Sequence, residues 1–238
     1  MNPEAAQCAP ERPANRLLLL PYALPYLMYV AIASLLGGRV SAEVSYLLRL
    51  GCVPVALAWG WKWYSGVRGP RNPWGSAGVG AAWGIAGAVV WVALLRPFAP
   101  ESAQAWSGTA FVLRLAAAGL VVPIFEELLM RGFVLRLAYQ WDVLRRSGAS
   151  QPLARALHDH CVDEVPAGGW TPAAVAVSTL AFAAGHQVYE WPAAAAYGLL
   201  MAGLWIRRKD LLSCIAAHGV TNAALAAYVW TAGAWELW

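Results

Sequence analysis

Residues 108–135 read GTAFVLRLAAAGLVVPIFEELLMRGFVL, a long apolar stretch that only a few charged side chains interrupt. An α-helix needs about 20 mostly apolar residues to cross the hydrocarbon core of a bilayer. The stretch therefore predicts a membrane-spanning helix. Pro123 lies near its middle. Because proline removes a helical hydrogen bond, it predicts a kinked or broken helix at this point.

The composition of the whole chain supports a membrane protein. Hydrophobic residues make up 60% of the 238 residues and charged residues only 13%, whereas soluble domains have about 25% charged residues. This excludes a disordered tail, a disulfide-rich secreted module and a soluble nucleic-acid-binding protein. Further apolar stretches lie at 17–37, 44–61, 76–99, 171–189, 192–206 and 211–233. The sequence predicts an all-α, polytopic transmembrane helical bundle of about seven or eight spans.

The basic residues indicate how this bundle is oriented. If the N-terminus lies inside, the outer loops hold only Arg39 and Arg96, and all other loop arginines and lysines are on the inner side. The inner set is Arg12, Arg16, Lys62, Arg68, Arg71, Arg136, Arg145, Arg146, Arg155, Arg207, Arg208 and Lys209. Since loops on the cytoplasmic side are enriched in Lys and Arg, we predict a cytoplasmic N-terminus.

Three regions follow from this topology: a cytoplasmic N-terminal tail at 1–16, N-terminal transmembrane helices at 17–106 and a transmembrane core at 107–238. The core contains a polar segment at 138–170, which predicts one cytoplasmic loop with a short surface helix around 152–160. We expect a multi-pass protein of the cell inner (cytoplasmic) membrane. Its expected partners are the lipid bilayer and a substrate, with no nucleic acid. The sequence leaves the oligomeric state open.

Several charged side chains lie inside the predicted spans, where each costs about 2.5–3.5 kcal/mol on insertion scales. Arg49 and Arg114 are close to helix ends, so we expect them to snorkel to the interface. Glu127 and Arg131 are four residues apart and can form an ion pair on one helix face. Glu126 points about 100° away from Glu127 and is free to face a cavity, where a carboxylate can act as a general base. The alternative is a structural Glu–Arg bridge that locks two helices.

Two later spans carry polar side chains at helical spacing. Ser178, Phe182 and His186 occur at intervals of four, as do His218 and Asn222. A single intramembrane histidine more often makes a helix–helix contact than it catalyses a reaction. Polar groups on three separate spans, however, can meet only inside the bundle.

These residue types suit the hydrolysis of a peptide bond. A glutamate with a histidine can activate water, and a histidine with an asparagine can donate hydrogen bonds to an oxyanion. The chain has no H-E-x-x-H motif, and we expect no cofactor. A zinc ion is the disfavoured alternative, and its ligands would be Glu126, His186 and His218.

Taken together, these motifs resemble the CPBP family of intramembrane proteases, which includes CAAX prenyl endopeptidases and bacteriocin-processing or immunity-related (Abi-like) proteins. The resemblance rests on E-E-x-x-x-R, F-x-x-x-H and H-x-x-x-N in this order, each in a predicted span, and extends over about 108–233. In this chain the motif residues are Glu126, Glu127, Arg131, Phe182, His186, His218 and Asn222.

The resemblance implies a role for each of these residues. Glu126 would activate water with the help of His186, and His218 and Asn222 would form the oxyanion site. The remaining motif residues would support the site, with two orienting the catalytic glutamate and one lining the pocket: Glu127, Arg131 and Phe182. The family resemblance implies a glutamic-type endopeptidase that acts on a membrane-associated protein or peptide.

Two other functions fit the same residues. The first is a non-catalytic membrane scaffold or bacteriocin-immunity-type protein that keeps the helical core. The second is a proton-coupled transporter in which Glu126 and His186 relay protons. A transporter predicts inverted repeats, and none is evident in the sequence.

Overall fold

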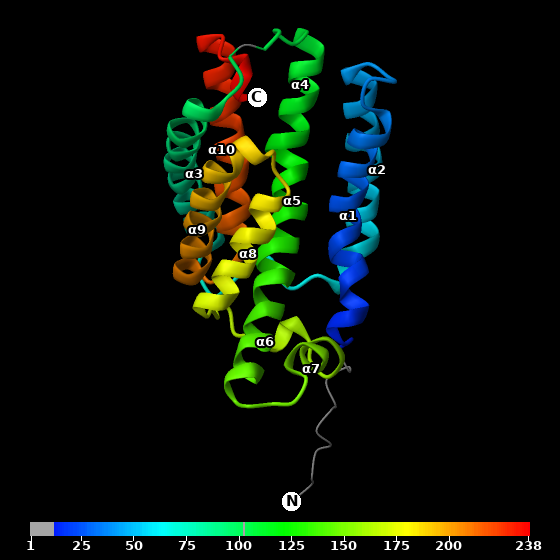
Figure 1. The fold of residues 1–238 in the computed structure, drawn as a ribbon, viewed down its shortest axis with the longest axis vertical. Coiled ribbons are helices and arrows are strands. Elements are labelled where there is room, and N and C mark those ends of the chain that lie inside the picture. The colour runs from blue at the N-terminus through cyan, green and yellow to red at the C-terminus, as the bar shows by residue number, and fades with distance from the viewer. Residues whose placement is uncertain (1–11, 102) are drawn as a thin grey trace, which may run out of the picture.

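The computed structural model describes residues 12–101 and 103–238, and in these residues it contains helices and no strand. The α-helices are α1 (Asn15–Leu36), α2 (Ala42–Gly60), α3 (Pro73–Leu95), α4 (Gly108–Ala116), α5 (Val122–Glu127), α6 (Leu135–Arg146), α7 (Pro152–His158), α8 (Pro172–Ala184), α9 (Trp191–Arg208) and α10 (Leu211–Ala232) (Figure 1). The predicted all-α fold is therefore confirmed.

Five helical segments in the described residues are long and apolar enough to cross a membrane: Asn15–Leu36, Ala42–Trp63, Pro73–Phe98, Gly108–Arg146 and Leu211–Ala232. They make the chain a multi-pass membrane protein. Helix α8 is apolar but shorter than a full span. The count of seven or eight spans and the cytoplasmic N-terminus remain predictions.

Helices α4, α5 and α6 form one continuous helical segment of 39 residues, Gly108–Arg146. Two π-helical segments, Ala117–Val121 and Leu128–Val134, flank α5. Pro123 stands near the start of α5, where its ring and its missing N–H disturb the regular ladder of hydrogen bonds. The chain accommodates the proline with wider turns and does not break. Such π-helical turns occur frequently at functional sites.

Two predicted boundaries are wrong. The fourth span was expected to end at 135 and its loop to begin at 138, but α6 continues to Arg146. It continues because the buried Asp142 carboxylate accepts ion pairs from Arg145 and Arg146, which stabilise the polar end of the helix. The fifth span was expected to reach 189, but α8 ends at Ala184, where Gly185 caps it. The predicted surface helix is α7.

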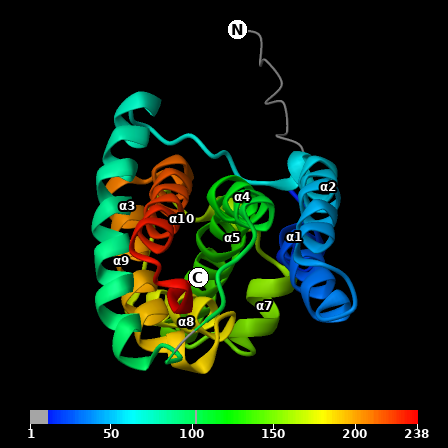
Figure 2. The ribbon, with the colours of Figure 1, turned by 90° about the horizontal axis from the view of Figure 1, so that it is seen from above.

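The bundle has a central helix between two groups of helices. In Figure 2, α4 and α5 lie in the middle, the α1–α2 hairpin lies on one side, and α3, α9 and α10 lie on the other. Close packing of α3 on α10 depends on Gly80 and Gly84, because a Cβ atom at either position would collide with the backbone of α10. Small residues at such spacing allow membrane helices to approach closely.

The start of α1 is fixed to the polar segment that follows α6. The Asn15 side chain donates to the carbonyl oxygen of Ala156 and to Gln140, at 2.7 Å each, and accepts from the backbone N–H of Val162 at 2.6 Å. Arg12, just before α1, pairs with Asp163 of the same segment at 3.1 Å. These contacts hold the N-terminal hairpin against the core, so that α1 and α2 can contribute to a site in the bundle.

Candidate active site

Glu126 and Glu127 are adjacent on α5 but lie in different environments. The Glu127 side chain is fully buried, and its Oε1 pairs with Arg131 Nη1 at 3.2 Å, as the spacing of four residues predicts. Arg131 also donates to the carbonyl oxygen of Gly198 at 3.1 Å, and its guanidinium lies 5.5 Å from the centre of the Phe182 ring. The Glu126 side chain is 14% exposed and faces a cavity. One carboxylate is thus enclosed, and the other can contact a ligand.

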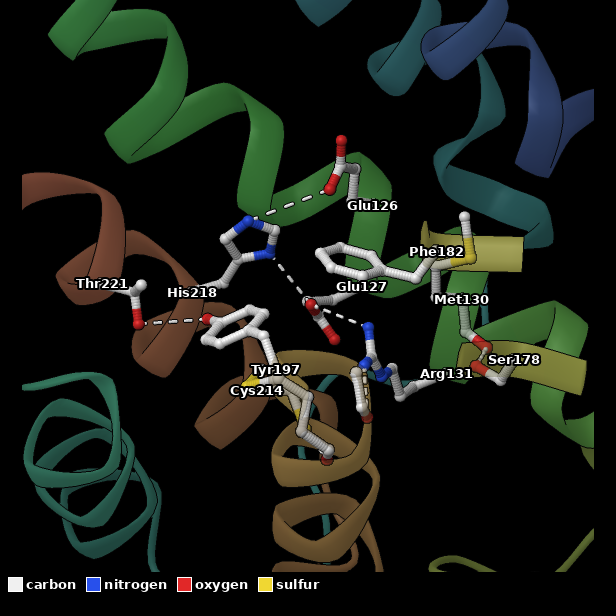
Figure 3. A network of polar contacts seen from close by, with 12 residues as sticks. Glu126, Glu127, Met130, Arg131, Ser178, Phe182, Tyr197, Cys214, His218 and Thr221 are labelled. Carbon is white, nitrogen blue, oxygen red and sulfur yellow. Dashed lines mark hydrogen bonds and ion pairs between the residues drawn. The ribbon is translucent and has the colours of Figure 1, made fainter. Parts of the chain in front are cut away.

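His218 on α10 lies between the two carboxylates, as Figure 3 shows. Its Nδ1 is 2.9 Å from Glu127 Oε1, and its Nε2 is 3.8 Å from Glu126 Oε2. Because an ionised carboxylate only accepts hydrogen bonds, Nδ1 carries a proton toward Glu127. This contact fixes the orientation of the ring and directs Nε2 toward Glu126.

His186 lies just beyond the end of α8 and not on it, contrary to the predicted helical register. The helix ends before it because Gly185 forms the cap, and the backbone N–H of His186 donates to the carbonyl oxygen of Ala183 at 3.0 Å. Its Nδ1 is 2.9 Å from the carbonyl oxygen of Phe182. A carbonyl oxygen only accepts, so Nδ1 carries a proton, and Nε2 is the free nitrogen of the neutral ring. The ring packs against Phe182 and Trp91, with centroids 4.6 and 5.3 Å apart.

Asn222 lies one turn after His218 on α10, as the spacing predicts. Its amide nitrogen donates to the carbonyl oxygen of Ala118 at 2.7 Å. Ala118 belongs to the π-helical segment before α5, so this bond joins α10 to the helix that carries Glu126. An amide has two N–H donors, and the second is available to a ligand.

A cavity of about 510 Å³ brings these groups together. The predicted residues on its wall are Glu126, Phe182, His186, His218 and Asn222. Glu127 and Arg131 are not on the wall, because both side chains are fully buried behind it. Ser178, which shares the predicted face of α8, is also buried and donates to the carbonyl oxygen of Met130 at 3.1 Å. The motif residues thus separate into a group that can touch a ligand and a group that supports it.

Among the wall residues that sequence reasoning missed are Trp91, Tyr197 and Thr221. The Tyr197 hydroxyl donates to Thr221 at 3.1 Å, Thr221 donates to the carbonyl oxygen of Gly84 at 2.8 Å, and the Tyr197 and His218 rings lie 5.7 Å apart. Helices α3 and α9 therefore complete the site. The spacing of Gly80 and Gly84 could have predicted that α3 packs closely against another helix. No feature of the sequence indicated that Tyr197 and Thr221 meet at that contact.

In the described part of the chain, no group of three or more His, Cys, Asp or Glu side chains is arranged to hold a metal ion. Glu126, His186 and His218 all reach the same cavity, and they are the residues named above as the ligands of the disfavoured zinc ion. That the chain needs no cofactor stays a prediction, and chelation tests it.

Comparison with known proteins identifies one family. Residues 108–224 match the family model described as type II CAAX prenyl endopeptidase Rce1-like. The match includes α4 to α9, most of α10 and every motif residue from Glu126 to Asn222. No curated protein and no solved structure matches the chain.

Proposed function

We infer that this chain, which belongs to the CPBP family of intramembrane proteases through its Rce1-like domain at residues 108–224, is a glutamic-type endopeptidase that cleaves a membrane-associated protein or peptide. The observation that carries the proposal is the placement of Glu126 on the cavity wall with His218 3.8 Å away. In the proposed reaction, water attacks the peptide carbonyl directly, and no covalent bond forms between enzyme and substrate.

In the first step, Glu126 accepts a proton from water while the free Nε2 of His186 accepts a hydrogen bond from the same water. The resulting hydroxide attacks the carbonyl carbon, and the carbonyl oxygen becomes the oxyanion of a tetrahedral intermediate. Glu126 then returns its proton to the leaving amine, and the carbon–nitrogen bond breaks. A positioned general base of this kind contributes about 10²–10⁴-fold in rate.

The oxyanion is stabilised by donors on α10. His218 donates from Nε2, which requires protons on both of its ring nitrogens, and Asn222 donates the amide N–H that Ala118 does not use. Removing one such donor typically costs about 10²–10³-fold in kcat. Both donors are fixed by contacts outside the cavity, so they need little reorganisation during the reaction.

Glu127 and Arg131 act as positioning residues. Glu127 holds His218 through Nδ1, and Arg131 holds Glu127. Arg131 is held in turn by the carbonyl oxygen of Gly198 on α9. This chain of contacts joins α5, α9 and α10, and fixes the histidine relative to Glu126.

The proposal is tested by incubating purified protein in detergent with a peptide library and identifying new termini by mass spectrometry. We expect cleavage by the native chain and at least tenfold slower cleavage by His186→Ala, because alanine offers the water no acceptor. The matched control is His158→Ala, which changes an exposed histidine on α7 and should keep the native rate. Absence of cleavage of any peptide by the native chain would contradict the proposal and favour the scaffold function.

A further inference from the structure

Two arginines inside membrane-crossing helices line the same cavity as Glu126. Arg49 lies on α2 and Arg114 on α4. That they snorkel to the interface stays a prediction, and both line the cavity that a substrate would occupy. Intramembrane arginines that face a cavity commonly mark the path of a substrate or ion.

Aromatic rings hold both guanidinium groups. Arg49 lies 4.7 Å from the ring centre of Tyr29 and 4.4 Å from that of Tyr46. Arg114 lies 4.7 Å from Trp106 and 4.6 Å from Trp238. Stacking restrains the plane of a guanidinium but leaves its N–H groups, which lie in that plane, free to donate. The two side chains are therefore preorganised as donors.

Neither arginine has an anionic partner in residues 12–101 and 103–238. No carboxylate there lies within 4.0 Å of either group. Arg49 donates to the Ser45 hydroxyl at 3.1 Å, while its Nε is buried without an acceptor. The indole N–H of Trp238, which lines the same cavity, is also buried without an acceptor. Arg114 lines the cavity and forms no side-chain hydrogen bond within the described residues, so its N–H groups are available to an acceptor that a ligand supplies.

Besides Glu126, two more carboxylates line the cavity wall, Glu190 and Glu236, and none of the three lies within ion-pair distance of Arg49 or Arg114. Glu190 accepts a hydrogen bond from the backbone N–H of Gln187 at 2.8 Å, which holds the turn that follows His186. Neither of these two carboxylates is therefore a direct partner of Arg49 or Arg114.

We propose that Arg49 and Arg114 form an anion-recognition site that binds a carboxylate or phosphate group presented with the substrate. The proposal rests on the proposed peptidase function and adds a determinant of substrate choice. Arg114 and Glu126 are on one continuous helix, twelve residues apart, which corresponds to about 18 Å along the axis. The anionic group therefore binds several residues away from the scissile bond.

The test measures binding in the Glu126→Gln background, so that it does not depend on cleavage. The probes are an acetylated hexapeptide of alternating Leu and Ala with a free C-terminal carboxylate and its amidated twin, in nanodiscs of phosphatidylcholine. We expect the carboxylate form to bind at least about tenfold more tightly, since hydrogen bonds to a charged group are stronger than those to a neutral amide. Arg49→Gln with Arg114→Gln should abolish this difference. Arg39→Gln, at an exposed arginine between α1 and α2, should keep it.

A second measurement distinguishes a lipid headgroup from a peptide carboxylate. Nanodiscs containing phosphatidylglycerol are analysed by native mass spectrometry, and the retained lipid is compared between the native chain and the double variant. Loss of retained phosphatidylglycerol in the double variant, with equal binding of the two peptides, assigns the site to a lipid phosphate.

A conservative variant separates recognition from folding. Lysines at both positions keep the charge and should retain part of the preference, although they lose the stacked, planar donor. Two results would overturn the proposal. The first is that the Glu126→Gln protein binds both peptides equally and that the native and double-variant proteins retain equal amounts of lipid. The second is that Arg39→Gln also loses the preference for the carboxylate peptide. If binding depends on the arginines but no library peptide is cleaved, the anion-recognition site is supported and only the peptidase function is contradicted.

Discussion

Replacing Glu126 by glutamine is expected to lower kcat for peptide cleavage by about 10²–10⁴-fold, because the amide cannot accept a proton from water. The change keeps the size and shape of the side chain. Glu126 is on the cavity wall and forms no short hydrogen bond within the described residues, so the melting temperature should stay close to that of the native chain. Initial rates and thermal unfolding, measured on the same preparation, check both statements.

The matched control is Glu101→Gln, which neutralises an exposed glutamate in the segment between α3 and α4. It should cleave at the native rate. If Glu126→Gln cleaves within threefold of the native rate, Glu126 is not the base, and water must be activated by another group. A large loss of activity together with a large fall in melting temperature would instead assign Glu126 a structural role.

Replacing Arg131 by methionine is expected to destabilise the protein by about 3–5 kcal/mol, because the change removes the guanidinium partner of a buried carboxylate and leaves Glu127 with His218 alone. Both side chains of the pair are fully buried, so solvent cannot take the place of the lost partner. For a chain of this size the corresponding fall in melting temperature is roughly 6–20 °C. Thermal unfolding in detergent, followed by circular dichroism, measures it.

The double variant Glu127→Gln with Arg131→Met separates charge from packing. Removing the charge along with its partner should recover much of the lost stability, since a buried pair as a whole contributes far less than either charge left alone. Arg96→Met, at an exposed arginine after α3, is the control for the loss of a surface charge. A melting temperature for Arg131→Met equal to that of the native chain would contradict the role of this pair.

Much of the fold could be predicted because the bilayer restricts the possible structures. Scarce charge and long apolar stretches indicated membrane helices, and the spacing of Glu127 and Arg131 indicated a contact within one helix. The spacing of residues along the sequence did not predict where helices end. The end of α6 depends on ion pairs of Asp142, and the end of α8 depends on Gly185, so His186 leaves the helical register.

Contacts between distant parts of the chain were harder to predict. The hydrogen bond between His218 and Glu127 joins α10 to α5, and the bond of Tyr197 to Thr221 joins α9 to α10. Proximity to a helix end suggested snorkelling for Arg49 and Arg114, and it did not predict that both line the cavity. Such contacts follow from the rotation of each helix about its axis, which hydrophobic spacing determines poorly when a helix is apolar all round.

Cleavage by metal-free protein is the most direct test of the central claim, that a glutamate and not a metal ion activates water in this cavity. The native chain is treated with a chelator, passed into metal-free buffer and assayed with a peptide that the untreated protein cleaves. We predict an unchanged rate, and an unchanged rate again after zinc is added. Loss of cleavage on chelation, with recovery on addition of zinc, would contradict the glutamate mechanism and favour a metal site at Glu126, His186 and His218.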